Sequence, residues 1–297
     1  MSTGAYDEFA YLQENLDEWG LSGPVPPVRR CFVAVDGLRQ LSGLQFGDGE
    51  PEAILLHGVG QNAHTFDTVA LALRRPLLAL DLPGHGHSDT SPFGPVAVED
   101  YASDVIAAWE ALAPAGRHLA GMSLGGLVAI AISDRRPDLV SSLTLIDISP
   151  GVTPEKSRHV TTFVNGPATF ASFEEILART VEHNPTRSES SLRRGILHNA
   201  IQRPDGSWVW RHQRHPRASV EAPDAADLWE RLARLTMPVT LVRALGPGSV
   251  VDDADEAQFR RLLPHAHVVG VPGSGHSVQG DAPVVLAEIL AAAWSRR

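Results

Sequence analysis

Short apolar runs that favour strands alternate along most of this chain with segments that have helical periodicity. The runs are residues 53–56, 76–80, 118–120, 143–146, 239–242 and 268–271. The helix candidates are roughly residues 62–73, 97–112, 124–135, 224–235, 253–263 and 281–295. Strands that are apolar throughout are typical of a parallel sheet with helices on both faces. The pattern therefore predicts an α/β fold with a mostly parallel sheet.

Three segments depart from this alternation. Residues 31–35 and 38–46 are joined by Asp36-Gly37, which favours a tight hairpin turn. Residues 151–220 lie between turn signals at 149–151 and 222–224, which indicates an insertion into a core made of residues 30–150 and 221–297. Residues 1–29 form an acidic extension in which four large apolar residues fall near helical spacing: Phe9, Leu12, Leu16 and Trp19. We expect this helix to pack against the core, although it could also pack on the insertion, cover the entrance of a site or join a homodimer.

The charge of the chain is unevenly distributed. The whole chain has a net charge of −10, but residues 151–220 contain ten basic and six acidic residues. The insertion is therefore positive by four charges and the rest is negative by fourteen. Binding to nucleic acids or to anionic membranes requires a dense positive surface, so neither partner is expected. The expected partner is a small molecule.

Several features bear on the cellular location and on metal binding. Cys31 is the only cysteine, so the chain forms no internal disulfide and no cysteine-based zinc site. The longest apolar run, residues 126–132, is far shorter than the roughly 18 residues of a membrane-spanning helix. Residues 1–28 include acidic side chains but no basic one, unlike a secretory signal. We expect a cytoplasmic protein without a metal.

The segment Gly121-Met122-Ser123-Leu124-Gly125 matches the pattern G-x-S-x-G. It follows a predicted strand and begins a predicted helix, which is the context that this motif requires. The glycines allow a sharp turn in which side chains would clash, and the turn exposes the hydroxyl of Ser123. The helix N-terminus then faces the reacting oxygen. Ser123 is therefore the candidate nucleophile.

A second glycine-containing loop, His57-Gly58-Val59-Gly60, follows the predicted strand at 53–56. Such a loop can present a backbone amide to a developing negative charge. We expect the amides of Val59 and Leu124 to form an oxyanion hole. His57 is expected to brace the loop rather than to carry a proton.

A serine nucleophile requires a base that accepts its proton. His276 lies in Gly273-Ser274-Gly275-His276, on a loop that leaves the last predicted strand. Loops at the carboxyl ends of parallel strands are where such sheets place their sites. His85 and His87 are alternatives, but they lie in a loop dense in turn residues, where histidines more often make structural hydrogen bonds. His276 is the predicted base.

Residues 57–60, 81–88, 121–125 and 275–276, in this order and spacing, resemble the α/β-hydrolase family. The resemblance covers about residues 30–297. It implies an eight-stranded, mostly parallel sheet flanked by helices, a mainly helical cap inserted after the sixth strand, and a nucleophile–acid–histidine triad. The insertion at 151–220 lies where that cap belongs.

The acid of the triad departs from the commonest pattern of this family, in which it follows the seventh strand. In this chain the expected position is occupied by Ser249, and the nearest carboxylate, Asp252, is better suited to begin the next helix. Asp147, at the end of the sixth predicted strand, resembles the acid of a subset of small esterases in the family. Asp147 is the predicted acid, Asp252 is the alternative, and Ser249 would support Asp147 by a hydrogen bond.

A serine nucleophile forms an acyl-enzyme, so the resemblance implies hydrolysis of a carboxylic ester or thioester without a cofactor. Two alternatives are a serine-dependent carbon–carbon bond hydrolase or lyase and a non-catalytic binding protein. Trp208 and Trp210 follow the turn Asp205-Gly206 and share one face of a predicted hairpin, where they could line an acyl site or pack in a core. The arginines of the insertion could favour an anionic substrate or could simply be solvated.

Overall fold

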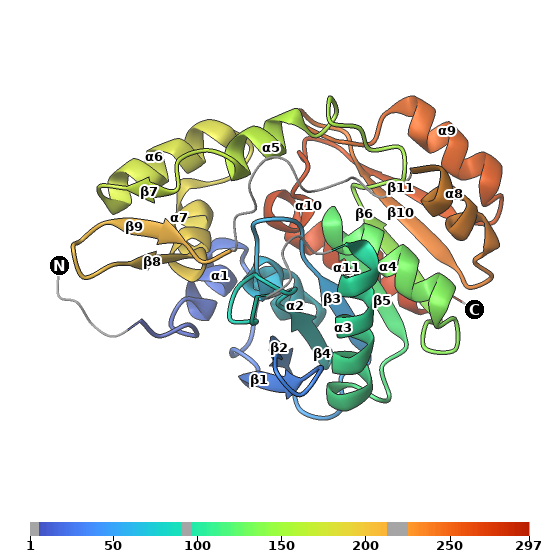
Figure 1. The fold of residues 1–297 in the computed structure, drawn as a ribbon, viewed down its shortest axis with the longest axis horizontal. Coiled ribbons are helices and arrows are strands. Elements are labelled where there is room, and N and C mark those ends of the chain that lie inside the picture. The colour runs from blue at the N-terminus through green and yellow to red at the C-terminus, as the bar shows by residue number, and fades with distance from the viewer. Residues whose placement is uncertain (1–5, 91–96, 213–224, 297) are drawn as a thin grey trace.

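The computed structural model describes residues 6–90, 97–212 and 225–296 and contains an eight-stranded sheet with the order β1-β2-β4-β3-β5-β6-β10-β11 (Figure 1). Strand β2 pairs antiparallel with both β1 and β4, and the remaining neighbours are parallel. The predicted mostly parallel sheet is confirmed. Its strands are β1 (Val28–Ala34), β2 (Gln40–Phe46), β3 (Ala53–Leu56), β4 (Leu77–Leu80), β5 (His118–Met122), β6 (Ser142–Ile146), β10 (Val239–Ala244) and β11 (His267–Val271).

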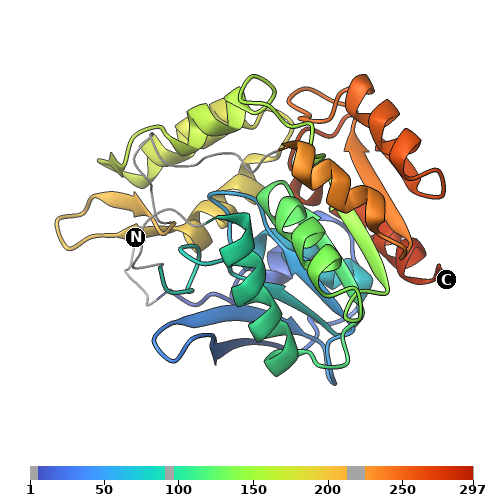
Figure 2. The same ribbon diagram turned by 45° about the vertical axis from the view of Figure 1, so that its right-hand side comes forward.

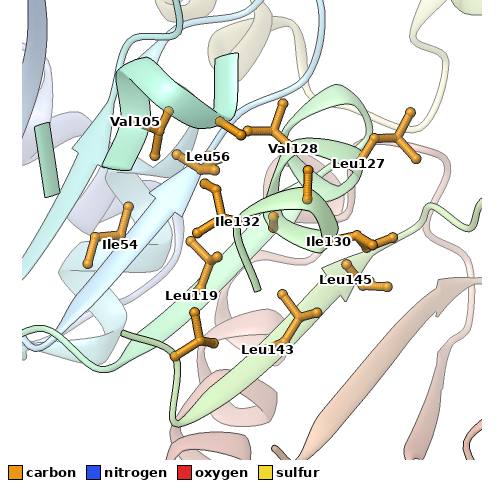
Figure 3. Packing of buried hydrophobic residues seen from close by; sticks show 14 of the residues in the cluster. Ile54, Leu56, Val105, Leu119, Leu127, Val128, Ile130, Ile132, Leu143 and Leu145 are labelled. Atoms are coloured by element: carbon orange, nitrogen blue, oxygen red, sulfur yellow. The ribbon is translucent and has the colours of Figure 1, made fainter. Parts of the chain in front are cut away.

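The continuous apolar runs reflect strands that are buried on both faces. Along β3, Ile54 and Leu56 belong to one hydrophobic cluster, whereas Ala53 and Leu55 belong to another. The first cluster includes side chains of α3 (Val98–Leu112), α4 (Leu124–Arg135), α8 (Ala225–Arg234) and α9 (Asp253–Leu262). Figure 3 shows part of it, with Leu119 and Leu143 of the sheet beside Ile132 of α4.

The opposite face carries the other cluster. Its side chains come from α1 (Leu12–Glu18), the short 3-10 helix η1 (Ala63–Phe66), α2 (Asp67–Leu73), α10 (Val278–Asp281) and α11 (Pro283–Trp294). The predicted helix at 62–73 is therefore divided into η1 and α2, and the one predicted at 281–295 begins earlier as α10. Pro283 occupies the first position of α11, where a missing amide hydrogen costs little, and it explains why a new helix begins there.

Strand β1 begins at Val28, earlier than the predicted residue 31. Arg29 and Arg30 are charged, so a pattern of apolar residues does not include this start of the strand. Arg30 is accommodated because its guanidinium donates to the buried carboxylate of Asp81 at 2.7 Å and to Glu8 at 2.6 Å. The predicted strands at 118–120 and 239–242 are likewise longer, as β5 and β10.

The inserted segment lies together at one side of the body in both views (Figures 1 and 2). It contains α5 (Arg158–Val164), α6 (Phe173–His183), α7 (Glu189–Asn199) and a small sheet with the order β7-β9-β8. The predicted hairpin is present: β8 (Ala200–Gln202) and β9 (Trp208–Trp210) pair antiparallel around Gly206, and β7 (Thr169–Phe170) completes the sheet. The expected end of the insertion at residue 220 and the turn signal at 222–224 lie outside the described residues.

The amphipathic helix of the N-terminal extension contacts both the body and the insertion. Leu12 and Leu16 are buried in the cluster that contains α2. On its other side, Glu14 pairs with Arg193 at 2.7 Å and Glu18 pairs with Arg194 of α7. The helix therefore packs against the core, as expected, and also on the insertion, which was one of the alternatives, because its acidic face meets a basic face of the insertion.

No helix among the described residues combines the length and the apolar character needed to cross a bilayer.

Close backbone approach at the β5–α4 junction depends on two glycines. A Cβ added at Gly121 would lie 2.2 Å from the carbonyl oxygen of Gly125, and one added at Gly125 would lie 2.4 Å from the carbonyl oxygen of Leu56. Both obstacles are backbone atoms, which cannot move as a flexible side chain can. The contact between strand, turn and helix therefore excludes any side chain at either position.

We predict that Gly125→Ala lowers the free energy of unfolding by about 3 kcal/mol or more, because the added methyl group overpacks rigid backbone. Gly195→Ala in α7 is the matched control: its Cβ would meet nothing within 4 Å, so it should raise stability by about 0.5–1 kcal/mol through helix propensity. Urea denaturation measures both variants. Equal stabilities of the two variants would contradict the steric account.

Candidate active site

Ser123 lies in the sharp turn between β5 and α4. Its backbone has φ 51° and ψ −120°, a conformation that is rare for a residue with a side chain. The turn is held by the amide of Gly125, which donates to the carbonyl of His57 at 3.1 Å, and by the amide of Ser123, which donates to Ile146 at 3.3 Å. These bonds fix Ser123 between the ends of β3 and β6.

Asp147 and His276 lie together at the carboxyl ends of β6 and β11. His276 Nδ1 and Asp147 Oδ2 are 2.8 Å apart, and the Asp147 carboxylate is fully buried. The same carboxylate accepts hydrogen bonds from the Ser249 hydroxyl at 2.7 Å and from the amides of Ala244 at 3.0 Å and Val250 at 3.1 Å. The structure thus brings Asp147, Ser249 and His276 into one hydrogen-bonded group.

Asp252, the alternative acid, occupies a different place. It is the N-cap of α9, where its carboxylate accepts from the amide of Asp255 at 2.9 Å. It also pairs with Lys156 at 2.9 Å, and a hydrogen bond from Lys156 lowers its pKa. Its hydrogen bonds therefore serve the helix and the insertion rather than His276.

Ser123 and His276 line the same cavity of about 180 Å³. Among the described residues, no hydrogen bond joins the Ser123 hydroxyl to the His276 ring. Catalytic hydrogen bonds of this kind are often long or misaligned until a substrate binds, so the gap is compatible with proton transfer in a complex. His159 of the insertion lies edge-on to the His276 ring, with centroids 6.0 Å apart.

Of the two residues whose amides are expected to form an oxyanion hole, Val59 lines this cavity and Leu124 directly follows Ser123, which lines it. Leu124 is the first residue of α4, so its amide lacks an acceptor within the helix. Within the described part of the chain, the amides of Val59 and Leu124 both remain without a hydrogen-bond acceptor. The loop that carries Val59 is braced by Gln61, whose side-chain oxygen accepts from the amide of Gly58 at 3.1 Å.

His57 and His85 each accept a hydrogen bond from a backbone amide of a loop near the site. His57 is fully buried, its Nε2 accepts from the amide of Leu82 at 3.0 Å, and burial lowers its pKa. His85 Nε2 accepts from the amide of Gly60 at 3.1 Å, and burial lowers its pKa to about 3. Both rings are thus neutral acceptors within loops. Burial also lowers the pKa of His87, whose amide donates to Asp81.

The two tryptophans of the insertion differ in position. Trp210 lines the cavity and also packs edge-on against Phe170. Trp208 packs against Phe173 and is absent from the cavity wall. The prediction left open whether these indoles line a site or pack in a core: both pack against a small core cluster of the insertion, and Trp210 also lines the cavity.

Sequence patterns missed several residues of the cavity wall. Asn15 comes from the N-terminal extension, and Gln279, which is almost fully buried, comes from α10. The Gln279 side chain donates to Gln61 at 3.3 Å and to Thr65 at 3.2 Å. These residues carry no motif. A polar residue within an otherwise apolar helix face was the only local signal for Asn15.

A cluster of buried polar residues forms one end of the cavity. His64, Asp67 and His198 offer ligand atoms that lie within 4.8 Å of one another, as a metal site would require. However, the rings of His64 and His198 stack almost parallel, with centroids 3.7 Å apart and 8° between planes. Because ring-nitrogen lone pairs lie in the ring plane, parallel rings direct them side by side rather than at one point. As arranged, these rings suit stacking better than joint metal coordination.

Charge pairing accounts for this cluster. Burial alone would lower the pKa of His64, but Asp67 and Glu8 outweigh it and raise the pKa to about 9. Likewise, hydrogen bonds from His64 and Arg30 overcome the burial of Glu8 and lower its pKa to about 2. The stacked His198 is buried, and its pKa is lowered well below the usual range. His64 is therefore a cation at neutral pH that holds the N-terminal extension to the body.

We predict that the protein loses stability as the pH rises from about 6.5 through about 9. The folded pKa of His64 lies above the unfolded value, so its contribution is complete below 6.5 and disappears as the folded state loses this proton. The loss should be on the order of 3 kcal/mol. Denaturant unfolding at pH 7 and 9.5 measures it, and His64→Gln should remove most of the difference.

His118→Gln is the matched control, because His118 stacks on Trp294 far from this cluster and its pKa is lowered. It should retain the alkaline loss of the unchanged protein. A parallel loss in the unchanged protein and in His64→Gln would show that other groups cause it.

Comparisons with known proteins show the family of this chain. Residues 53–289 match the alpha/beta hydrolase family. The chain is 40% identical over 291 residues to esterase Rv0045c of Mycobacterium tuberculosis. This match covers 96% of this chain and 94% of that protein. A crystal structure of that esterase has a TM-score of 0.85 and 37% identity, and the match covers 99% of this chain and 100% of that one. The chain is also 29% identical over 238 residues to 2-(acetamidomethylene)succinate hydrolase of Mesorhizobium japonicum, spanning 79% of this chain and 84% of that protein. The chain therefore belongs to the alpha/beta hydrolase family.

Proposed function

We propose that this hydrolase cleaves small carboxylic esters through an acyl-enzyme on Ser123, with His276 as the base and Asp147 as the acid of the triad. The observation that carries the proposal is the 2.8 Å contact between His276 Nδ1 and a buried Asp147 carboxylate, next to a serine in a strained strand-to-helix turn. The 40% identity to an esterase supports an ester as the substrate.

The reaction proceeds in two steps. His276 Nε2 takes the proton of the Ser123 hydroxyl while the oxygen attacks the ester carbonyl. The amides of Val59 and Leu124 stabilise the oxyanion, and His276 then protonates the departing alcohol, which leaves an acyl group on Ser123. In the second step, His276 takes a proton from water, the hydroxide attacks the acyl group, and the acid is released as Ser123 regains its proton.

Asp147 has an orienting role in this proposal. Its Oδ2 fixes the Nδ1–H tautomer of His276, which leaves Nε2 free to accept the serine proton. The three other hydrogen bonds to the carboxylate fix its orientation beside the imidazolium that forms during the reaction. No cofactor or metal is needed for these steps.

The cavity limits the substrate. Its volume of about 180 Å³ is smaller than the roughly 300–1,000 Å³ typical of sites for drug-sized ligands. We therefore propose a short acyl chain and a compact alcohol or thiol. We also propose that the substrate is a small molecule and that the protein is cytoplasmic and binds no nucleic acid. A measurement of molecular mass in solution would test for a homodimer.

We predict that a fluorophosphonate probe labels the protein and that Ser123→Ala abolishes labelling, because only this serine has an activating base in the proposed mechanism. A panel of p-nitrophenyl esters of increasing chain length should show highest activity with short chains. Labelling without turnover of any ester or thioester would favour a carbon–carbon bond hydrolase, and an unreactive Ser123 would favour a binding protein.

We predict that Asp147→Asn lowers kcat by about 10³–10⁴-fold, because an amide cannot hold the required tautomer of His276. Asp252→Asn should stay within about threefold of the original rate, since asparagine is as good an N-cap as aspartate. Steady-state kinetics of both variants measure this. A large loss in Asp252→Asn alone would reassign the acid.

A further inference from the structure

Arg187 lies in the connection between α6 and α7 and reaches the cavity that Ser123 and His276 also line. Its guanidinium rests on the backbone of Gly280 in α10, where a Cβ would lie only 2.7 Å from the Cζ and Nε atoms of the arginine. The Nη2 group donates to the Ser191 hydroxyl at 2.8 Å. The insertion thus holds this guanidinium against α10, the helix that follows His276.

The charge of Arg187 lacks a partner at close range. Its Nε is buried without a hydrogen-bond acceptor, and none of the ion pairs of the described residues includes it. Burial lowers its pKa, and the nearest acidic influence is Asp281, which raises it. However, Asp281 forms no ion pair with Arg187, and one of its oxygens accepts instead from the amide of Gly275 at 2.7 Å and from Thr186 at 3.0 Å.

Two neighbouring arginines on α7 are paired, in contrast to Arg187. Arg194 also lines the cavity, but Glu18 and Asn15 bind its guanidinium. Arg193 lies on the same helix and pairs with Glu14 at 2.7 Å. A guanidinium remains protonated even when it is buried, and a buried charge is costly unless an opposite charge or several acceptors face it. Arg187 is thus available for an anion inside the cavity.

We propose that Arg187 is a specificity-determining residue that binds a carboxylate of the substrate, so that the preferred substrates are small esters carrying a second, anionic group. This inference rests on the proposed function, because it assigns the substrate class of the same site. The side-on Nε–H and Nη–H groups of a guanidinium match the two oxygens of a carboxylate. The Ser191 hydroxyl, which accepts from Arg187, retains its own proton to donate to the same group.

Two matched pairs of esters test the proposal from both sides of the scissile bond. The acyl-side pair is the p-nitrophenyl monoester of adipate and p-nitrophenyl hexanoate. The alcohol-side pair is para-carboxyphenyl acetate and para-carbamoylphenyl acetate. In at least one pair, the anionic ester should have a kcat/KM about tenfold or more above that of its neutral counterpart. A preference for the neutral ester in both pairs would overturn the proposal.

Variants assign the preference to the residue. Arg187→Gln should lower kcat/KM on the preferred anionic ester by about tenfold or more and leave the neutral ester within about threefold. Arg193→Gln, which removes an equal charge from the neighbouring helix α7 at a residue that does not line the cavity, should change the kcat/KM of neither ester. An equal loss on both esters in Arg187→Gln, with a lowered Tm, would instead show that Arg187 is a structural partner of Asp281.

If Arg187→Gln does not fold, inhibition of the unchanged protein tests whether the site binds a carboxylate. Adipate should inhibit hydrolysis of p-nitrophenyl hexanoate with a Ki about tenfold below that of adipamide. Equal inhibition by the two compounds would overturn the proposal. Failure of the proposed function looks different, because then no ester of either charge is cleaved and Ser123 is not labelled.

Discussion

A fully buried carboxylate holds together the loops on which the site depends. Asp147, which follows β6, accepts hydrogen bonds from Ala244 at the end of β10, from Ser249 and Val250 in the loop after β10, and from His276 after β11. One side chain therefore aligns the ends of three strands. A buried carboxylate is costly unless its oxygens are hydrogen-bonded, and these four donors satisfy them. Positioning of His276 and stability of this edge of the sheet thus have one physical cause.

The cavity is made by three parts of the chain that are distant in sequence. The body provides Ser123 and His276, the insertion provides Arg187 and Trp210, and the N-terminal extension provides Asn15. Ion pairs between acidic residues of the extension and basic residues of the insertion connect the second and third parts. These ion pairs neutralise part of the positive charge of the insertion. Of the two arginines among the described residues that line the cavity, Arg194 is paired and Arg187 is not, so Arg187 is the one left to act on a ligand there.

Sequence patterns predicted those features that depend on local backbone constraints. The turn at Ser123 requires glycines at fixed positions because backbone atoms of neighbouring elements touch there. This requirement can be recognised in the sequence as a glycine motif. The apolar strands are visible because they are buried on both faces. Features that depend on distant charges were missed. Arg30 can lie in a strand only because Asp81 and Glu8 meet it, and no local pattern records that meeting. The separate positions of Trp208 and Trp210 depend in the same way on packing against distant residues.

The position of the acid illustrates how the sheet permits variation within a fixed geometry. Strands β6 and β10 are parallel neighbours, with Ile146 opposite Val242, and the amide of Asp147 donates to the carbonyl of Val242 at 2.7 Å. A carboxylate at the end of either strand can therefore reach the same nitrogen of a histidine that follows β11. In this chain the carboxylate that contacts His276 directly follows β6, and the loop after β10 contributes Ser249, whose hydroxyl donates to that carboxylate. Moving the carboxylate from one strand to its neighbour leaves Ser123 and His276 in place. Their positions depend on β5 and β11, which precede them, and not on which strand supplies the carboxylate. The sheet constrains where the carboxylate group must lie, and the sequence remains free to supply it from either neighbouring strand.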